Sequence, residues 1–437
     1  MGKSAPGPDG ISPRVMNKRK TERTTAFLNL ILTLETIPDH LNLARVLFIP
    51  KSETPQGSGD YRPISITSVV VRCLHSILAK RWITVVPRLH SQLAFLKRDG
   101  CFEGVVSVHT ILREARLATH NLTMCSIDIS KAFDSLSHDT IKRMAEAYGA
   151  PKALVSYISN CYKSLKAIVH NNIVKVGRGV RQGDPLSPLL FIMCMDEVTR
   201  LTTREHGTKL GSQMVDSVLF ADDMMIFADT TVGMQHKLDM LSAGLQQAGL
   251  STNVQKSRSL TVAANGKLKT VCVVPHTYKI GGVSLDPINV TDKFKYLGIW
   301  FSHPGITKQP ISTMADSLLN EITNAPLTPV QRLTILRQYA LPKLQYVCQV
   351  GAIGKTDLQK VDVSIRKSVR QWLGLPHDTA NTYFHARDGG IGIEPLYPLA
   401  EIRRSQRLRR LNTRNCSLLQ AVRQSEAYKL FEGKSIG

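Results

Sequence analysis

The chain has 437 residues, of which 56 are Lys or Arg and 34 are Asp or Glu, so its net charge is +22 and its isoelectric point is near 9.8. A basic surplus of this size indicates a polyanionic partner, most often nucleic acid. The longest apolar run, Leu189–Met195, is far short of the roughly 20 residues that a membrane-spanning helix needs. The 8 cysteines form no C-x-x-C pair, which leaves zinc and dithiol sites without support. Scattered thiols and an N-terminus unlike a signal peptide favour an intracellular protein, in the nucleus, the cytoplasm or both.

The charge is unevenly distributed along the chain. Residues 125–230 hold 12 basic and 12 acidic side chains, whereas residues 305–437 hold 19 basic and 10 acidic ones. A neutral, Asp-rich middle between basic flanks suits a protein that grips a polyanion at its flanks and holds divalent cations centrally. In the densest basic run, helical spacing puts Arg403, Arg407 and Arg410 on one face. This face predicts a helix that follows phosphates, with an ordinary solvated helix face as the alternative.

Apolar periodicity, caps and turn residues predict the elements in chain order. The predicted helices are Thr24–Thr36, Ser65–Val85, Val105–Thr119, Ser137–Tyr148, Ser187 to about Arg204, and Gln235–Ala248. The predicted strands are Ala44–Ile49, Met124–Asp128, a ribbon over Ala167–Val176, a hairpin over Val218–Phe227, and Lys295–Phe301. From about Ile306 onward the pattern is mostly helical, with breaks at Pro326, Pro342 and Pro376. This order predicts an α+β fold with a C-terminal helical lobe.

Two carboxylate patterns stand out among these elements. Asp128 ends a predicted strand, and Asp222 and Asp223 lie at the tip of an apolar hairpin. Adjacent aspartates repel unless a cation neutralises them, and hard oxygen ligands suit Mg²⁺. Two such ions stabilise the attacking and leaving oxygens of an in-line phosphoryl transfer. Each pattern alone also fits a solvated turn or a helix N-terminal acid, but their joint occurrence at two strand ends favours a metal site.

Four motifs follow one another in the middle of the chain: Asp128-x₄-Phe133-Asp134, Arg181-Gln182-Gly183-Asp184-Pro185-Leu186-Ser187-Pro188, Phe220-Ala221-Asp222-Asp223 and Phe294-Lys295-Tyr296-Leu297-Gly298. Together they resemble the palm of a reverse transcriptase of the kind that non-LTR retrotransposons encode, and most closely the elements that insert into ribosomal RNA genes. Upstream, Gly7-Pro8-Asp9-Gly10-Ile11, Ile49-Pro50-Lys51 and Tyr61-Arg62-Pro63-Ile64-Ser65 resemble the finger motifs of that family, and downstream, Trp372-Leu373-Gly374-Leu375-Pro376-His377 and Asp388-Gly389-Gly390-Ile391-Gly392-Ile393 resemble its thumb region. The resemblance implies a right-hand polymerase fold. Its expected parts are interleaved fingers and an N-terminal extension over 1–123, a palm over 124–304 with an antiparallel sheet packed on helices, and a helical thumb with a basic C-terminal segment over 305–437.

The resemblance also implies a role for each matching residue. Two Mg²⁺ ions, with Mn²⁺ as an alternative, are expected on Asp128, Asp222, Asp223 and the backbone carbonyl of Ile129. The other expected roles are triphosphate binding by Lys51 and Arg62, a sugar gate at Phe133, nucleotide contacts at Gln182 and Gly183, protonation of the leaving pyrophosphate by Lys256, and a primer grip at Tyr296, Leu297 and Gly298.

The expected partners are an RNA template, a DNA primer or nicked target DNA, and dNTPs. The sequence has no Cys/His cluster and too little chain beyond the thumb for a nuclease, so it resembles an isolated polymerase core, either a fragment or a degenerate copy. Two alternatives stay open. An RNA-dependent RNA polymerase is disfavoured by Phe133 and by Ala221, where that class usually has Gly. A catalytically silent RNA-binding remnant is disfavoured by the presence of all three carboxylates.

Overall fold

The computed structural model describes residues 4–18, 21–86, 89, 91–203, 206–386 and 389–433. Two predicted features, the helix end near Arg204 and the thumb-motif residue Asp388, lie outside the described residues. Helices and largely antiparallel sheets alternate along the chain and a run of helices follows, so the predicted α+β class is confirmed. Within the described part of the chain, no helix is both long and apolar enough to cross a membrane.

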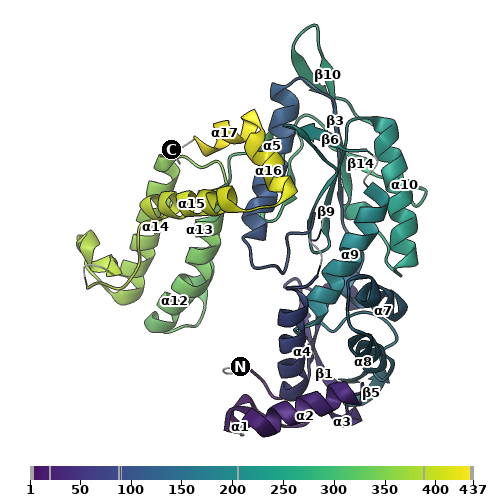
Figure 1. Ribbon diagram of the computed structural model, residues 1–437. Helices are drawn as coiled ribbons and strands as arrows, with labels where there is room; N and C mark the ends of the chain where they lie inside the picture. Colours follow the sequence, from purple (N-terminus) through teal and green to yellow (C-terminus); the bar gives the residue numbers. More distant parts are fainter. Residues whose placement is uncertain are drawn as a thin grey trace.

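The N-terminal lobe, at the bottom of Figure 1, is built around a four-stranded sheet in the order β2-β1-β4-β5. Strand β1 pairs antiparallel with β2 and parallel with β4, so the predicted ribbon β4–β5 completes a sheet that begins much earlier in the chain. The elements of this lobe are α1 Pro13–Lys18, α2 Thr21–Thr33, α3 Asp39–Asn42, β1 Leu43–Pro50, η1 Ser58–Asp60, β2 Tyr61–Ile66, α4 Val69–Trp82, β4 Lys166–Val169 and β5 Asn172–Lys175.

The helix predicted over Ser65–Val85 begins too early. Ser65 pairs with Val46 in the β1–β2 ladder, so the strand continues to Ile66 before α4 starts. Ser68 caps the helix, because its side chain accepts a hydrogen bond from the amide of Val70 at 3.1 Å. An apolar run alone does not separate the end of a strand from the start of a helix.

The central sheet has the order β11-β10-β3-β9-β8, with β14 paired to β10. Its elements and the helices around it are α5 Gly100–Leu117, β3 Leu122–Ile127, α6 Ala132–Ser135, α7 His138–Ala147, α8 Lys152–Lys163, α9 Ser187–Thr203, β6 Thr208–Leu210, β7 Gln213–Val215, β8 Ser217–Phe220, β9 Asp223–Ala228, α10 Thr231–Gln247, η2 Val254–Lys256, β10 Arg258–Asn265, β11 Thr270–Val273, β12 Lys279–Ile280, β13 Val283–Ser284 and β14 Asp286–Pro287.

Both faces of the central sheet are buried. Along β3, Leu122 and Met124 join the core cluster that contains α5 and the C-terminal helices, whereas Cys125 and Ile127 join the cluster that contains α7, α9 and α10. Successive strand residues point to opposite faces, so two-sided burial needs nearly continuous apolar strands. The short apolar runs that predicted β3 and the β8–β9 hairpin arise from this arrangement.

The strand predicted over Lys295–Phe301 is instead a hairpin. Strand β15 (Phe294–Tyr296) pairs with β16 (Ile299–Ser302), which pairs in turn with β17 (Gly305–Ile306). Leu297 and Gly298 form the turn with φ of 44° and 83°. A two-residue turn with positive φ at both positions matches the right-handed twist of the flanking strands, and only the glycine signals it in the sequence.

The C-terminal lobe, on the left of Figure 1, is helical as predicted. The helix break that was predicted at Pro342, however, does not occur, because Pro342 lies inside the continuous helical stretch. A π-helical turn, η3, joins α12 to α13, and this wider turn accommodates a proline near the start of α13. The elements are α11 Ile311–Asn324, α12 Pro329–Ile335, η3 Leu336–Ala340, α13 Leu341–Val350, α14 Lys355–Leu373, η4 Asn381–Phe384, α15 Leu396–Thr413, α16 Ser417–Gln424 and α17 Glu426–Glu432.

Candidate active site

Asp128 stands immediately beyond β3, where the strand leaves the central sheet. Its amide donates to Ser257 Oγ at 3.1 Å, and its carbonyl accepts from the amide of Asn253 at 2.7 Å. Ile129 forms an isolated antiparallel bridge with Thr252, and the two hydrogen bonds of that bridge come from the neighbouring residues. The backbone at Asp128 is therefore fixed on both sides, and the bridge leaves the Ile129 carbonyl unused.

Asp222 lies in a two-residue turn between β8 and β9. Phe220 pairs with Asp223, so the turn consists of Ala221 and Asp222, and Asp223 is the first residue of β9. The predicted hairpin is confirmed, with its tip one residue earlier than the Asp-Asp pair. Ala221 has φ of 56°, a left-handed conformation that non-glycine residues seldom adopt.

Asp128 and Asp223 adjoin the last pair of the β3–β9 ladder. Ile127 pairs with Met224, so Asp128 and Asp223 are the next residues along the two strands. Strand alternation directs both carboxylates to the α5 face of the sheet, opposite to Ile127 and Met224. Partial burial raises the pKa of Asp223 to about 6, and the charges of Asp222 and Asp128 add to the rise. Burial also raises the pKa of Asp222, and Asp128 again adds to it. The three carboxylates therefore repel one another, and a cation would relieve that repulsion.

This carboxylate group suits a metal site that its substrate completes. Among the described residues, no group of three or more His, Cys, Asp or Glu side chains is arranged as a ready-made metal site. Mg²⁺ usually keeps several waters and is held by one or two carboxylates together with substrate phosphates. The oxygen donors at these two strand ends fit that mode of binding, and they do not form a closed protein cage.

Of the two predicted triphosphate cations, Arg62 lies near the candidate carboxylates. Arg62, exposed on β2, opposes the effect of burial on the pKa of Asp222. Lys51 and Lys256 both lie near Asp60, whose pKa is lowered chiefly by backbone N–H groups of its own turn and further by these two lysines. The fold therefore brings Arg62 near Asp222, and it brings Lys51 and Lys256, from separate segments, near Asp60, which lies two residues before Arg62.

Phe133, the predicted sugar gate, lies on α6 directly after the carboxylate strand. Its ring stacks on Phe191 of α9 with centroids 4.2 Å apart, and Phe95 contacts it edge-on at 6.3 Å. Phe191 is fully buried, whereas Phe133 is only partly buried. The ring is thus held against the core with part of its surface left open, as a steric gate requires.

Gln182 and Gly183 lie where the loop before α9 meets β2. The Gln182 carbonyl accepts from the amide of Ser65 at 2.7 Å, and its side-chain amide donates to Asp134 Oδ1 at 2.8 Å. Gly183 has φ of 107°, and a Cβ there would lie 2.9 Å from the Ser65 carbonyl oxygen. The resemblance implies a nucleotide contact at Gly183, and in the structure the group that approaches this glycine closely is the Ser65 carbonyl of strand β2.

A buried ion pair that the sequence did not reveal supports this loop. His75 Nδ1 on α4 lies 2.8 and 2.6 Å from the two carboxylate oxygens of Asp184, and Nε2 lies 2.8 Å from the Tyr157 hydroxyl. Asp184 also accepts from the amide of Leu186 at 2.8 Å. Burial alone would lower the pKa of His75, but the Asp184 charge outweighs it and raises the pKa to about 10. The same pairing lowers the pKa of Asp184 despite its burial. The pair therefore fastens the loop to the helix that follows β2.

Replacing His75 with Gln is expected to destabilise the fold by about 3–5 kcal/mol, because Asp184 would keep a buried, poorly compensated charge. Since the pKa of folded His75 is raised from 6.5 to about 10, its contribution is complete below pH 6.5 and is lost as the pH rises toward 10. The free energy of unfolding of the parent should therefore fall between these pH values, and that of the variant should not. Denaturant unfolding across this range makes the comparison, and a parent curve without this fall would contradict the ion pair.

Only part of the predicted primer grip is accessible at the protein surface. The Tyr296 ring is 3 % exposed and belongs to the core beneath the sheet, so its predicted contact with nucleic acid is not available to the side chain. The turn residues Leu297 and Gly298 lie nearer the surface, and the Leu297 carbonyl accepts from the Tyr346 hydroxyl of α13 at 2.7 Å. Tyr296 therefore anchors the turn from below, and any contact falls to Leu297 and Gly298.

The predicted arginine face lies on α15, but its members differ in their surroundings. Arg407 pairs with Asp99 at 3.1 Å and lies 5.6 Å from the centroid of the Phe102 ring. The Arg403 guanidinium bonds to the side chain of Gln345, and Arg410 is exposed. On this face, Arg403 and Arg407 therefore bond to other residues of the chain, whereas the charge of Arg410 is exposed to solvent.

Charge reversal of Arg403, Arg407 and Arg410 together is expected to flatten the salt dependence of RNA binding, by about one unit of log–log slope for each lost phosphate contact. Arg410→Glu alone is the cleaner variant, because reversal at Arg407 also breaks its pair with Asp99. Affinity for a single-stranded RNA measured between about 50 and 200 mM salt gives the slope. A parental slope in all these variants would identify the arginines as a solvated face.

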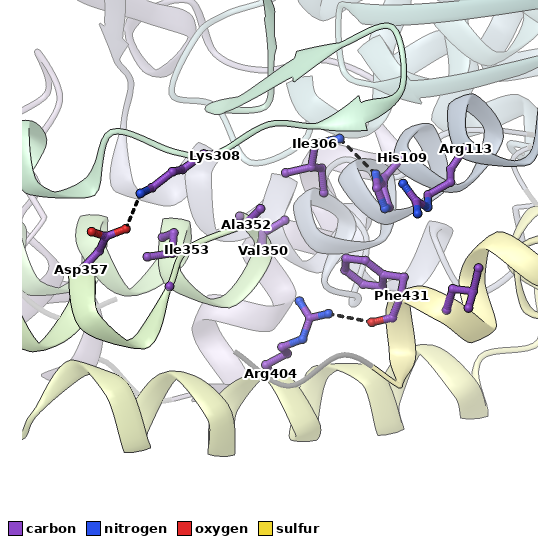
Figure 2. Close-up of a pocket in the computed structure, with 13 residues that line it drawn as sticks. His109, Arg113, Ile306, Lys308, Val350, Ala352, Ile353, Asp357, Arg404 and Phe431 are labelled. Atoms are coloured by element: carbon purple, nitrogen blue, oxygen red, sulfur yellow. Dashed lines mark hydrogen bonds and ion pairs between the residues drawn. The ribbon is translucent and has the colours of Figure 1, made fainter. Parts of the chain in front are cut away.

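A cavity of about 510 Å³ lies between α5, α15 and α17, apart from the carboxylates (Figure 2). Lys308 pairs with Asp357 at 2.8 Å, and Arg404 donates to the carbonyl of Phe431 at 2.9 Å. His109 accepts a hydrogen bond from a backbone amide of β17 at 3.0 Å. Of these three contacts, the His109 bond joins α5 to β17, whereas the other two lie within the C-terminal lobe. None of the three candidate aspartates lines the cavity.

A comparison with known protein families identifies the family to which the carboxylate-bearing part of the chain is similar. Residues 49–301 match the family described as "Reverse transcriptase (RNA-dependent DNA polymerase)". This stretch contains the three aspartates, Phe133, and all three predicted substrate cations. The chain therefore belongs to the reverse transcriptase family.

Two curated relatives indicate which kind of reverse transcriptase the chain is similar to. The chain is 37 % identical over 412 residues to the "Retrovirus-related Pol polyprotein from type-2 retrotransposable element R2DM" of Drosophila melanogaster, covering 93 % of this chain and 39 % of that protein. It is 34 % identical over 399 residues to the R2 polyprotein of Nasonia vitripennis, covering 90 % and 39 %. The resemblance to a non-LTR retrotransposon reverse transcriptase is thereby confirmed, and the chain spans about two fifths of the length of these two relatives.

Among solved structures, telomerase from Candida albicans with a fragment of telomeric RNA aligns at a TM-score of 0.44 and 12 % identity, covering 91 % of this chain and 65 % of that chain. Family membership and the α+β architecture identify the predicted right-hand polymerase fold. The N-terminal lobe, the central sheet with its helices and the C-terminal lobe follow one another along the chain in the order predicted for fingers, palm and thumb.

Proposed function

We propose that this chain is an RNA-directed DNA polymerase that adds deoxynucleotides to a primer on an RNA template, using two Mg²⁺ ions or, as an alternative, Mn²⁺. The observation that carries the proposal is that the last pair of the β3–β9 ladder, Ile127 with Met224, directly adjoins Asp128 on one strand and Asp223 on the other, with Asp222 in the next turn. Such convergence of carboxylates from two strands is what a two-ion phosphoryl transfer needs. The raised pKa values of Asp222 and Asp223 support it, because they reflect charges that burial and mutual repulsion make costly.

In the proposed reaction, the primer 3′-oxygen forms a bond to the α-phosphorus of the dNTP, the bond from the α-phosphorus to the bridging oxygen breaks, and pyrophosphate leaves. The ions, when bound to Asp128, Asp222, Asp223 and the Ile129 carbonyl, would stabilise charge on the attacking and leaving oxygens. The side chains with the remaining roles are Lys51 and Arg62 on the triphosphate, Lys256 as the donor of a proton to pyrophosphate, Gln182 beside the nucleotide, and Phe133 against a ribose 2′-hydroxyl.

The proposed partners follow from the same site. The basic thumb would track the phosphates of an RNA template and of a DNA primer or nicked target DNA. We place the fingers and N-terminal extension in 1–123, the palm in 124–304 and the thumb in 305–437, and we propose that the protein works inside the cell, in the nucleus, the cytoplasm or both. In this assignment, β4 and β5 join the sheet of the proposed fingers, because β4 pairs with β1, and α5 packs on the sheet of the proposed palm.

Primer extension on an RNA template, run separately with dNTPs and with rNTPs, tests the proposal. Extension with dNTPs that requires Mg²⁺ or Mn²⁺ is the expected result. Extension with rNTPs alone would instead identify an RNA-dependent RNA polymerase. Template binding without extension under either condition would identify a catalytically silent remnant.

A further inference from the structure

The side-chain amide of Gln92 brackets the turn that carries the paired aspartates. Its Oε1 accepts from the backbone amide of Ala221 at 2.9 Å, and its Nε2 donates to the Ala221 carbonyl at 3.3 Å. The Gln92 residue is 1 % exposed. A carboxamide that bonds both backbone groups of one residue fixes the peptide planes on either side of it.

The residues around Gln92 are themselves hydrogen-bonded to β8, the edge strand of the central sheet. Gln92 Oε1 also accepts from the amides of Leu93 and Ala94 at 3.1 and 3.0 Å, which fixes its own rotamer. Residues 91–93 form two backbone hydrogen bonds with β8. The amide of Leu93 donates to the Leu219 carbonyl at 2.9 Å, and the amide of Leu219 donates to the Ser91 carbonyl at 3.0 Å. Gln92 is therefore attached to the hairpin strand as well as to the hairpin turn.

The turn needs such support for two reasons. Ala221 has φ of 56° at a position where two-residue hairpins commonly use glycine, so its conformation persists only if the surroundings hold it. The residues that follow, Asp222 and Asp223, carry charges that repel each other and Asp128. We propose that Gln92 is a positioning residue for catalysis, which holds the Ala221 turn so that Asp222 and Asp223 are aimed at the metal site before any ion binds. This inference rests on the proposed function, since it takes those aspartates as metal ligands.

Gln92→Met keeps the side-chain length and removes both hydrogen bonds to Ala221, together with those from the amides of Leu93 and Ala94. In the protein without metal, backbone amides in residues 219–224 are expected to exchange hydrogen for deuterium faster than in the parent, because the bracket is lost. Extension is expected to slow by at least about tenfold, as small misplacements of catalytic groups do, and half-maximal rate should need more Mg²⁺. If the methionine variant does not fold, Gln92→Asn keeps a polar amide that is too short to bracket the turn, and the same losses are expected.

A double-mutant cycle separates positioning from simple packing. Glycine adopts positive φ without strain, so in the Ala221→Gly background the loss caused by Gln92→Met should shrink to within about threefold. The matched control is Gln309→Met, because Gln309 is a buried amide that brackets Trp300 in the same way, with bonds to its amide and carbonyl at 3.0 Å each. The effect of Gln309→Met should be the same in both backgrounds.

Three results would overturn the inference: parental amide exchange in Gln92→Met, parental extension in a folded Gln92→Met, or a loss that is equally large in the parent and in the Ala221→Gly background. An inactive parent would instead defeat the proposed function, and the exchange measurement would still decide whether the bracket holds the hairpin.

Discussion

Replacing Asp222 with Ala is expected to abolish primer extension while leaving the fold and RNA binding nearly intact. Removing one electrostatic stabiliser of a transition state typically lowers the rate by about 10²–10³, and loss of a metal ligand should lower it at least that far. Asp128→Ala should behave in the same way, because Asp128 and Asp223 adjoin the same last pair of the β3–β9 ladder. Single-turnover extension, a melting curve and an RNA-binding isotherm measure the three properties separately.

The melting temperature is informative in its own right. Asp222 is a source of the repulsion that raises the pKa of Asp223 to about 6, so its removal should not destabilise the protein. Asp139→Ala, at an exposed position on α7, is the matched control and should extend like the parent. Extension at the parental rate by Asp222→Ala would remove this residue from the active site.

Opening the volume at Phe133 is expected to change the choice of sugar. A ring in this position overlaps the 2′-oxygen of a ribonucleotide but leaves room for a deoxyribonucleotide. Rejection by a packed ring should exceed the roughly 10²-fold that an apolar pocket achieves against an added hydroxyl. Phe133→Val should therefore raise ribonucleotide incorporation relative to deoxyribonucleotide by at least about 10²-fold. The ratio of kcat/KM for the two nucleotides is the measurement.

The stacking of Phe133 on Phe191 makes a melting curve a necessary companion measurement. If Phe133 served only as an anchor for the core, Phe133→Ala would cost about 3–5 kcal/mol of stability and leave the sugar preference unchanged. Phe95→Ala is the control, because Phe95 contacts the same ring edge-on from a largely exposed position. An unchanged ratio in a folded, active Phe133→Val would reopen the RNA polymerase alternative.

The strands that hold the carboxylates could be predicted from the sequence because each is an apolar run bounded by a charged residue. Strands β3, β8 and β9 are covered on both faces, so they are apolar runs that stop where a charged residue appears. Asp128 and Asp222 are conspicuous for that reason. The aspartates could thus be located from local pattern, although the register that places Asp128 and Asp223 beside the same ladder pair could not.

Other features have no local signal. The turn at Leu297 was missed because leucine seldom adopts positive φ, and an apolar pattern continues across it. Gln92 lies 129 positions from Ala221, and His75 lies 109 positions from Asp184. Buried polar contacts of this kind depend on tertiary packing, which no spacing along the chain encodes. The arginine face on α15 was visible as a pattern, but its internal link from Arg407 to Asp99 was not.

In the proposed active site, Asp128, Asp222 and Asp223 hold two catalytic ions. Anomalous scattering from Mn²⁺ in crystals of the chain with an RNA template, a DNA primer and a non-hydrolysable dNTP tests it most directly. We expect two anomalous peaks about 4 Å apart, bounded by these carboxylates and by the nucleotide phosphates. A bound nucleotide with no ion at these three aspartates, or with its ions held by other residues, would contradict it.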